Sequence, residues 1–244
     1  MSGTKNSTKA AKFPYPGVTV RIGPSDLTGD TIATVAVFNS ANAKTGNVVQ
    51  VYFIPVAEHP IDAIDSGLDT AVCGDCPLKP SNDNVCYVRK YHGPAKVWTT
   101  FHNNRYPHYK DLSKADQDKV LSILASKPIR LGAWGDPAAD VESSKRLAEI
   151  GGRNTLAYTH QWKLFPELKP FAMASVDSAE EYIEAKQAGW RTYRHMPDWL
   201  LSSKSKNERL CPNSSHATKC LDCKLCNGTQ GYSKRDIVVA SIGA

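Results

Sequence analysis

Hydrophobic and polar positions along this chain follow first a strand pattern and then an alternation of strand and helix patterns. Three early stretches are rich in β-branched residues and are separated by Gly and Asn turn signals: 17–22, 31–38 and 47–54. They predict an N-terminal antiparallel β piece within residues 17–70. Residues 1–16 carry lysines but no apolar run, so we expect a flexible basic tail there rather than a secretory signal.

From about residue 96, predicted strands alternate with predicted helices. The predicted strands are 96–102, 128–134, 154–160, 169–176, 190–195 and 236–242, and the predicted helices are 113–126, 137–150 and 178–189. The helices place apolar residues three and four positions apart, as at Val120, Ile123 and Leu124. Repeated strand–helix units predict a parallel sheet that curls into a full or partial (βα) barrel over residues 71–244. The expected fold class is therefore α/β.

Polar residues follow these predicted strands at their carboxyl ends, where (βα) barrels build their active sites. The candidates are Gly135, Asp136, His160, Ser175 and Asp177, with His102 after the first strand. We predict that His160 and Asp177 are catalytic and that Gly135, Asp136 and Ser175 bind a cofactor. Structural alternatives stay open, because Asp136 could cap the helix that Pro137 begins, and His160 could be a hydrogen-bonded core residue.

Seven cysteines change this picture from a plain α/β domain to a metalloprotein. Cys73, Cys76 and Cys86 form a C-x2-C-x9-C set, and a C-x8-C-x2-C-x2-C set follows later: Cys211, Cys220, Cys223 and Cys226. Four thiolates close a metal or cluster site, whereas three leave a coordination position open for chemistry. Without a secretory signal, such spacings favour metal binding over disulfides, and we expect a reducing, cytoplasmic location.

The metal itself has two candidates at each cysteine set. The first set predicts a three-cysteine iron–sulfur cluster, or a zinc loop completed by a histidine such as His92. The C-x2-C-x2-C run of the second set is a strong iron–sulfur signal, with zinc as the alternative at this C-terminal, cysteine-rich site.

The net charge and the hydropathy of the chain limit the classes of partner that we expect. The formal net charge is +6, from 30 Lys and Arg against 24 Asp and Glu, which fits a nucleic-acid partner or simply a solvated basic surface. No apolar run approaches the ~18 residues that a transmembrane helix needs, so we expect no membrane partner.

Taken together, these elements resemble the radical S-adenosylmethionine superfamily over roughly residues 70–230. The GAWGDPAA segment is similar to the family's GGEP motif after the second strand, and MASVDSAEEYIEAKQAGW resembles its fifth-strand segment. The family's usual cysteine motif is C-x3-C-x2-C, from which this chain departs. The resemblance implies a [4Fe-4S] cluster, S-adenosyl-L-methionine, an electron donor, and contact of the GDP segment with the amino group of S-adenosylmethionine. The C-terminal cysteines resemble the family's auxiliary clusters.

The chain is also similar to small proteins of tailed phages that carry the same CP…CY, GDPA, YTHQW and C-terminal cysteine elements. This resemblance implies a role in thymine hypermodification, with a modified DNA base as substrate and the host cytoplasm as location. An aminoacyl-thymine isomerase is one example.

Two alternatives from other classes remain at this stage. A zinc-dependent barrel enzyme could exchange or modify a base as transglycosylases do, with Asp136 or Asp177 as the nucleophile. A zinc-binding module could instead bind nucleic acid without catalysis.

Overall fold

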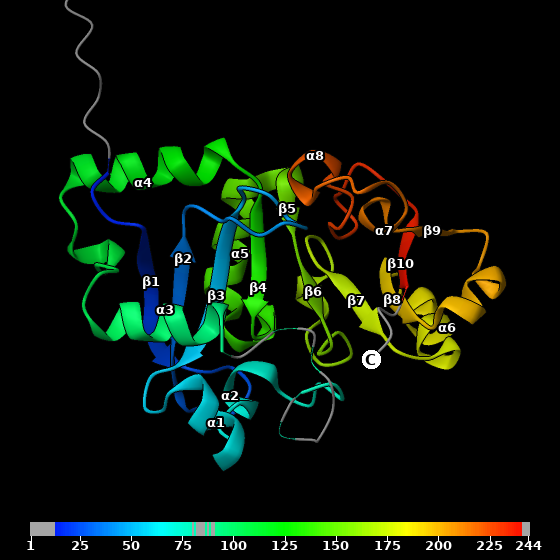
Figure 1. The fold of residues 1–244 in the computed structure, drawn as a ribbon, viewed down its shortest axis with the longest axis horizontal. Helices are drawn as coiled ribbons and strands as arrows, with labels where there is room; N and C mark the ends of the chain where they lie inside the picture. Colours follow the sequence, from blue (N-terminus) through cyan, green and yellow to red (C-terminus); the bar gives the residue numbers. More distant parts are fainter. Residues whose placement is uncertain (1–12, 80, 82–85, 87, 89–90, 241–244) are drawn as a thin grey trace, which may run out of the picture.

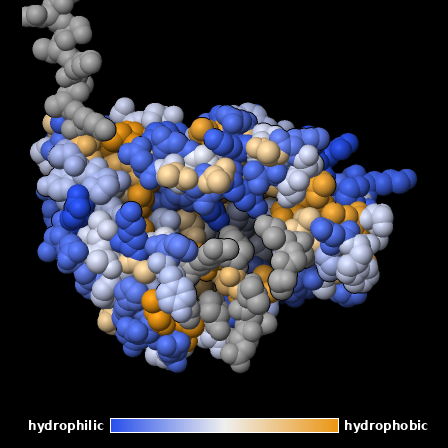
Figure 2. Space-filling view, in the orientation of Figure 1, coloured by the Kyte–Doolittle hydropathy of each residue, from blue (hydrophilic) through white to orange (hydrophobic). Residues whose placement is uncertain are grey.

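A computed structural model describes residues 13–79, 81, 86, 88 and 91–240. Two five-stranded sheets lie side by side (Figure 1), in the strand orders β1-β2-β3-β4-β5 and β6-β7-β8-β10-β9. Most of the molecular face in Figure 2 is hydrophilic, with hydrophobic residues scattered over it. Within the described residues, no helix has the length and apolar character that a membrane span requires.

The first sheet combines an antiparallel and a parallel part. Its strands are β1 (Gly17–Pro24), β2 (Thr31–Val37), β3 (Val49–Pro55), β4 (Ile129–Trp134) and β5 (Thr155–Leu156). β1, β2 and β3 are antiparallel neighbours, which confirms the predicted N-terminal antiparallel piece. β3 and β4, and then β4 and β5, pair in parallel, so this piece continues directly into the parallel part.

All pairings within the second sheet are parallel. Its strands are β6 (Tyr158–Thr159), β7 (Met173–Val176), β8 (Thr192–Met196), β9 (Glu208–Leu210) and β10 (Asp236–Ala240). Only Ala157 separates β5 from β6, and its N–H donates to the C=O of Cys226. Counting β5 and β6 together, the spatial order of six parallel strands, β3, β4, β5/β6, β7, β8 and β10, matches their order in the chain, and β9 lies outside them at the edge.

Helices connect these strands. The α-helices are α1 (Pro60–Ser66), α2 (Thr70–Cys73), α3 (Gly93–His102), α4 (Lys114–Ser126), α5 (Val141–Gly151), α6 (Ala179–Gln187), α7 (Pro212–His216) and α8 (Cys220–Cys223). Short 3-10 turns are η2 (Tyr109–Asp111), η3 (Pro137–Ala139), η4 (Gly152–Asn154), η5 (Pro166–Leu168) and η6 (Asp198–Ser203). Ser113 and Ser178 accept N-cap hydrogen bonds at α4 and α6, so these two helices begin where their sequences predict.

The predicted strand 96–102 is wrong, because these residues belong to α3. Pro94 starts this helix at a position where a missing N–H costs nothing. Val97 and Phe101, four residues apart, then pack against the main core from one face of the helix. Burial of that face outweighs the strand preference of its β-branched and aromatic residues.

The described strands do not close into a barrel. In a barrel built from the parallel strands, a strand of the second sheet would pair with β3 on the side away from β4. β2 already pairs with β3 on that side, and β1 and β9 are outermost strands of the two sheets. The part of the fold prediction that holds is the mixed α/β class with largely parallel strands.

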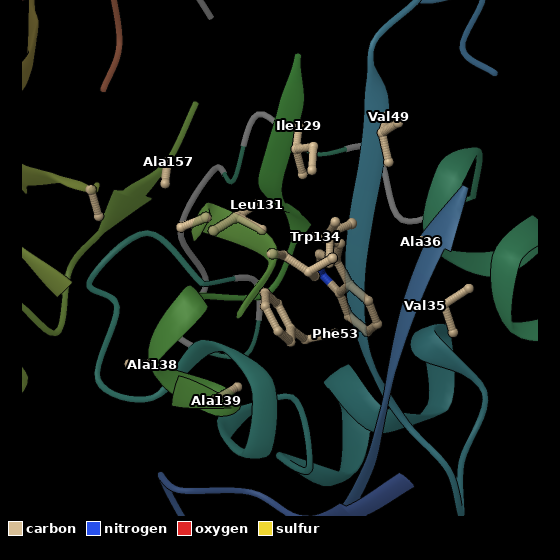
Figure 3. Packing of buried hydrophobic residues seen from close by; sticks show 14 of the residues in the cluster. Val35, Ala36, Val49, Phe53, Ile129, Leu131, Trp134, Ala138, Ala139 and Ala157 are labelled. Carbon is tan, nitrogen blue, oxygen red and sulfur yellow. The ribbon is translucent and has the colours of Figure 1, made fainter. Parts of the chain in front are cut away.

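The main core fixes the turn that follows β4. Figure 3 shows Phe53, Leu131 and Trp134 gathered between β3 and β4, with Ala138 and Ala139 of η3 close by. All five are buried. Burial of each large apolar side chain contributes about 1.5–3 kcal/mol, so the chain after β4 is held firmly at the carboxyl ends of the strands.

Candidate functional site

The two cysteine sets lie at opposite ends of the parallel strands. Cys73 ends α2, which packs on β3 and η3 at the carboxyl ends of β3 and β4 (Figure 1). At the other end, the N–H groups of Cys220 and Leu221 in α8 donate to carbonyls of Lys44 and Thr45, in the loop before β3. Folds of this kind place chemistry at the carboxyl ends and stability at the amino ends. The three-cysteine set therefore lies at the end where catalysis is expected.

The thiols of the three-cysteine set lie within electrostatic reach of one another. Desolvation raises the pKa of Cys73 well above its ordinary value, and the charges of Cys76 and Cys86 raise it further. Desolvation also raises the pKa of Cys86, with Cys76 adding to the effect. All seven cysteines of the chain are described, and none of them is in a disulfide. Mutually repelling thiols of this kind suit a cation that binds their thiolate forms.

His160 joins this cysteine set to the end of β7. Its Nδ1 lies 3.4 Å from Cys76 Sγ, and its Nε2 lies 3.2 Å from Asp177 Oδ2. Burial lowers the pKa of His160, but the hydrogen bonds to Asp177 and Cys76 and the charges of both outweigh it and raise the pKa to about 10. The imidazole is therefore protonated at neutral pH, between a thiol and a carboxylate. Both predicted catalytic residues thus lie beside the first cysteine set.

Asp136 acts as a structural junction at the same end of the sheet. Its Oδ1 accepts from Ala138 N at 2.9 Å and caps η3, and its Oδ2 accepts from His160 N at 2.9 Å. Its own N–H donates to Val72 O of α2 at 2.6 Å. Burial raises the pKa of this carboxyl, while these hydrogen bonds lower it. The capping alternative holds for Asp136, and the same side chain also ties the end of β4 to the end of β6.

Gly135 and Ser175, the other two predicted cofactor-binding residues, differ in their surroundings. Gly135 has φ of 81°, and a Cβ there would lie 2.8 Å from Phe53 Cβ and 3.0 Å from Val72 O. This glycine therefore allows α2 to pack closely on β3. Ser175 is buried within β7, two residues before Asp177.

His102 does not take the place expected of it. Because residues 96–102 are helical, this side chain lies on α3, where its Nε2 is 3.1 Å from Val56 O and its ring centroid is 3.8 Å from that of Trp98. Asp136, His160 and Asp177 meet at one site, whereas His102 is held by α3 and the residue after β3.

Asp69 is a residue of this site that our sequence reasoning missed. It is fully buried, and neither of its carboxylate oxygens has a hydrogen-bond partner among the described residues. Its charge acts on the thiols of both Cys73 and Cys86. An unpaired buried carboxylate costs several kcal/mol unless a cation compensates it. Together with three thiols within electrostatic reach of one another, this unpaired carboxylate is a candidate ligand for a cation.

The arrangement is not that of a single bound ion. In the part of the chain that the structure describes, no three His, Cys, Asp or Glu side chains are gathered as one metal ion requires. An iron–sulfur cluster places its own iron and sulfide atoms between its ligands and therefore needs them farther apart.

One pocket is lined by Tyr158 and Tyr193 together with all four cysteines of the second set: Cys211, Cys220, Cys223 and Cys226. Burial, together with the charges of the other three cysteines, raises the pKa of Cys226 to about 12 despite a hydrogen bond from Tyr158. The carbonyl of Cys226 accepts from Ala157 at the junction of the two sheets. A metal held here would therefore brace the sheet junction.

No family model, no curated protein and no solved structure matches this chain. The function proposed below therefore depends on the chemistry and the placement of the described residues.

Proposed function

We propose that this protein is a radical S-adenosylmethionine-type enzyme with an open, partial-barrel architecture. The observation that most supports this proposal is the order of the parallel strands. Six of them lie side by side in the order in which they occur along the chain, with β9 outside them, and the three-cysteine segment follows the first, β3, after α1. The GDP segment at 135–137 follows the second, β4, as the resemblance to the GGEP motif implies. MASV forms the fourth strand, β7, with Asp177 at its end, whereas the corresponding family segment belongs to the fifth strand, which is a departure from the family pattern.

In this proposal Cys73, Cys76 and Cys86 hold a [4Fe-4S] cluster through their thiolates. When bound, that cluster would supply the one electron, received from a donor, that cleavage of S-adenosylmethionine to methionine and a 5′-deoxyadenosyl radical requires. The chain contributes binding, orientation and protection from water. His160 keeps a proton between Cys76 and Asp177, and Asp177 fixes the imidazole ring. Asp136 supports the backbone beneath both.

The second cysteine set has a structural role in this proposal, with iron–sulfur or zinc as its metal. Its position at the amino ends of the strands and its link to the sheet junction support that division of labour. A closed four-thiolate site contributes folding energy, whereas the three-thiolate site keeps a position for chemistry.

We infer a nucleobase adduct in phage DNA as the substrate, with isomerisation of an aminoacyl-thymine as the example. The net charge of +6 supports a nucleic-acid substrate, and the likeness to phage proteins supports this particular base. The zinc-dependent transglycosylase alternative is less well supported, because both oxygens of Asp136 accept backbone N–H groups and Asp177 is paired with His160. Asp136 is therefore the less available of the two carboxylates as a nucleophile, because both of its oxygens are engaged.

Anaerobic purification tests this proposal. We expect a brown protein that contains iron and sulfide, absorbs near about 400 nm, and releases 5′-deoxyadenosine from S-adenosylmethionine with a chemical reductant. Cys76→Ala should abolish that release, whereas Asp75→Asn, an exposed change in the same loop, should not. A colourless zinc protein, or a Cys76→Ala variant that still cleaves S-adenosylmethionine, would show that the proposal is wrong.

A further inference from the structure

Asp69 and Cys73 occupy equivalent positions one helical turn apart. Asp69 is the residue before α2, and its C=O accepts from Cys73 N at 2.9 Å in the pattern of an α-helical turn. Side chains four residues apart on a helix lie on the same face. An aspartate at the start of a helix usually caps it, but this side chain makes no capping hydrogen bond. Its carboxylate is therefore directed elsewhere, on the face that carries the Cys73 thiol.

No described cation compensates this carboxylate. Lys79, also buried, donates from Nζ to Thr70 Oγ1 at 2.6 Å, and no salt bridge joins Asp69 to a described Lys, Arg or His. A carboxylate that is wholly buried and unpaired is one of the costliest groups in a protein interior. The neighbouring thiols add negative charge when they ionise, so a cation bound here would compensate both the thiolates and the carboxylate.

We propose that Asp69 is a fourth protein ligand of the metal centre held by Cys73, Cys76 and Cys86. This inference rests on the proposed function and names a residue that it does not use. A carboxylate oxygen is a harder and more easily displaced ligand of iron than a thiolate. Asp69 therefore closes the centre when no other ligand is present and yields its position to the amino and carboxylate groups of an incoming ligand.

The test compares Asp69→Asn with Asp75→Asn, a change of the same chemistry at an exposed position just after α2. Both variants and the parent chain are reconstituted without oxygen with ferrous iron and sulfide. Iron and sulfide content, the absorption spectrum and the iron affinity against a competing chelator are measured. We expect Asp69→Asn to lose iron affinity about 10–100-fold and to change the spectrum, with Asp75→Asn unchanged. Equal affinity and identical spectra in both variants would overturn the proposal.

Mössbauer spectra of the ⁵⁷Fe-reconstituted parent protein give a measurement that does not depend on how the variants fold. One iron with an oxygen ligand among sulfur-ligated irons is the expected result, and its signal should change when S-adenosylmethionine is added. Irons with sulfur ligands only would refute a ligand role for Asp69. If the oxygen-ligated iron is present but S-adenosylmethionine neither binds nor is cleaved, the Asp69 inference stands and the proposed function fails. If Asp69→Asn leaves the metal unchanged while S-adenosylmethionine is cleaved, the reverse holds.

Discussion

Replacement of Asp136 separates a structural from a ligand-binding role for the turn after β4. Asp136 is buried, and its two oxygens accept from the N–H groups of Ala138 and His160, each at 2.9 Å. Asp136→Ala removes both acceptors. Ala138 is fully buried, so water cannot replace the acceptor that its N–H loses.

The magnitude follows from these two hydrogen bonds. A hydrogen bond to a charged group contributes about 1.5–3 kcal/mol, and a buried N–H without a partner costs about 1–3 kcal/mol. Burial raises the pKa of Asp136, which shows that desolvating its carboxylate costs free energy. Part of the free energy that the two hydrogen bonds contribute offsets this cost. We therefore expect Asp136→Ala to lower the free energy of unfolding by about 2–4 kcal/mol. Asp136→Asn keeps one acceptor and should cost about half as much.

Urea denaturation and thermal melting of the same protein preparations measure this loss. For a chain of 244 residues, the expected fall in Tm for Asp136→Ala is roughly 4–16 °C. Ser178→Ala, which removes only the N-cap hydrogen bond to Glu181 N, is the control and should cost about 1 kcal/mol. An Asp136→Ala protein with unchanged stability but weaker S-adenosylmethionine binding would refute the structural role and restore the carboxylate as a ligand-binding group.

Three further changes have definite expected outcomes. Gly135→Ala should cost about 2–4 kcal/mol in urea melts, because φ is 81° and a Cβ would lie 2.8 Å from a neighbouring side chain; an unchanged midpoint would contradict this. Glu208→Ala should cost about 3–5 kcal/mol by the same assay, because it leaves the buried Arg194 guanidinium without its two-bond partner, and Arg194→Met added to it should recover part of the loss. In metal-free protein, protonated His160 stabilises the folded state fully below its unfolded pKa of about 6.5, and this stabilisation is lost as the pH rises through about 10. An NMR titration of His160 with a midpoint near 6.5 would exclude its pairing with Cys76 and Asp177.

Local signals predict the elements of this fold wherever burial and chain punctuation agree. Strand 128–134 becomes Ile129–Trp134, and Ser113 caps α4 as its sequence indicates. In α3 the residues between Val97 and Thr100 favour a strand, whereas the Pro94 start signal and the spacing of Val97 and Phe101 favour a helix. Such conflicts are decided by packing against other elements, which no local pattern contains.

The site was predictable in its residue types but not in all its members. Polar residues at strand ends identify His160 and Asp177, because parallel strands bring their carboxyl ends together. Asp69 lies in a segment without strand or helix periodicity, and only its spacing of four residues from Cys73 is a signal. Its lack of a partner is a property of the folded interior and cannot be seen in the sequence.

The hydrogen bond between Ala157 and Cys226 has a consequence for how the chain matures during synthesis. Residues 155–159 leave the ribosome long before Cys226, and the roughly 70 residues between them take about 4–14 s to translate. Until Cys226 has been synthesised, the first five strands can pair, but the hydrogen bond from Ala157 to Cys226 at the sheet junction cannot form. Apolar residues at that junction, such as Leu156 and Met173, stay open to water and to chaperones during the delay. Arrival of the second cysteine set, followed by β10, which joins β8 to β9 and packs against Leu156 and Met173, is therefore what closes the junction in the nascent protein.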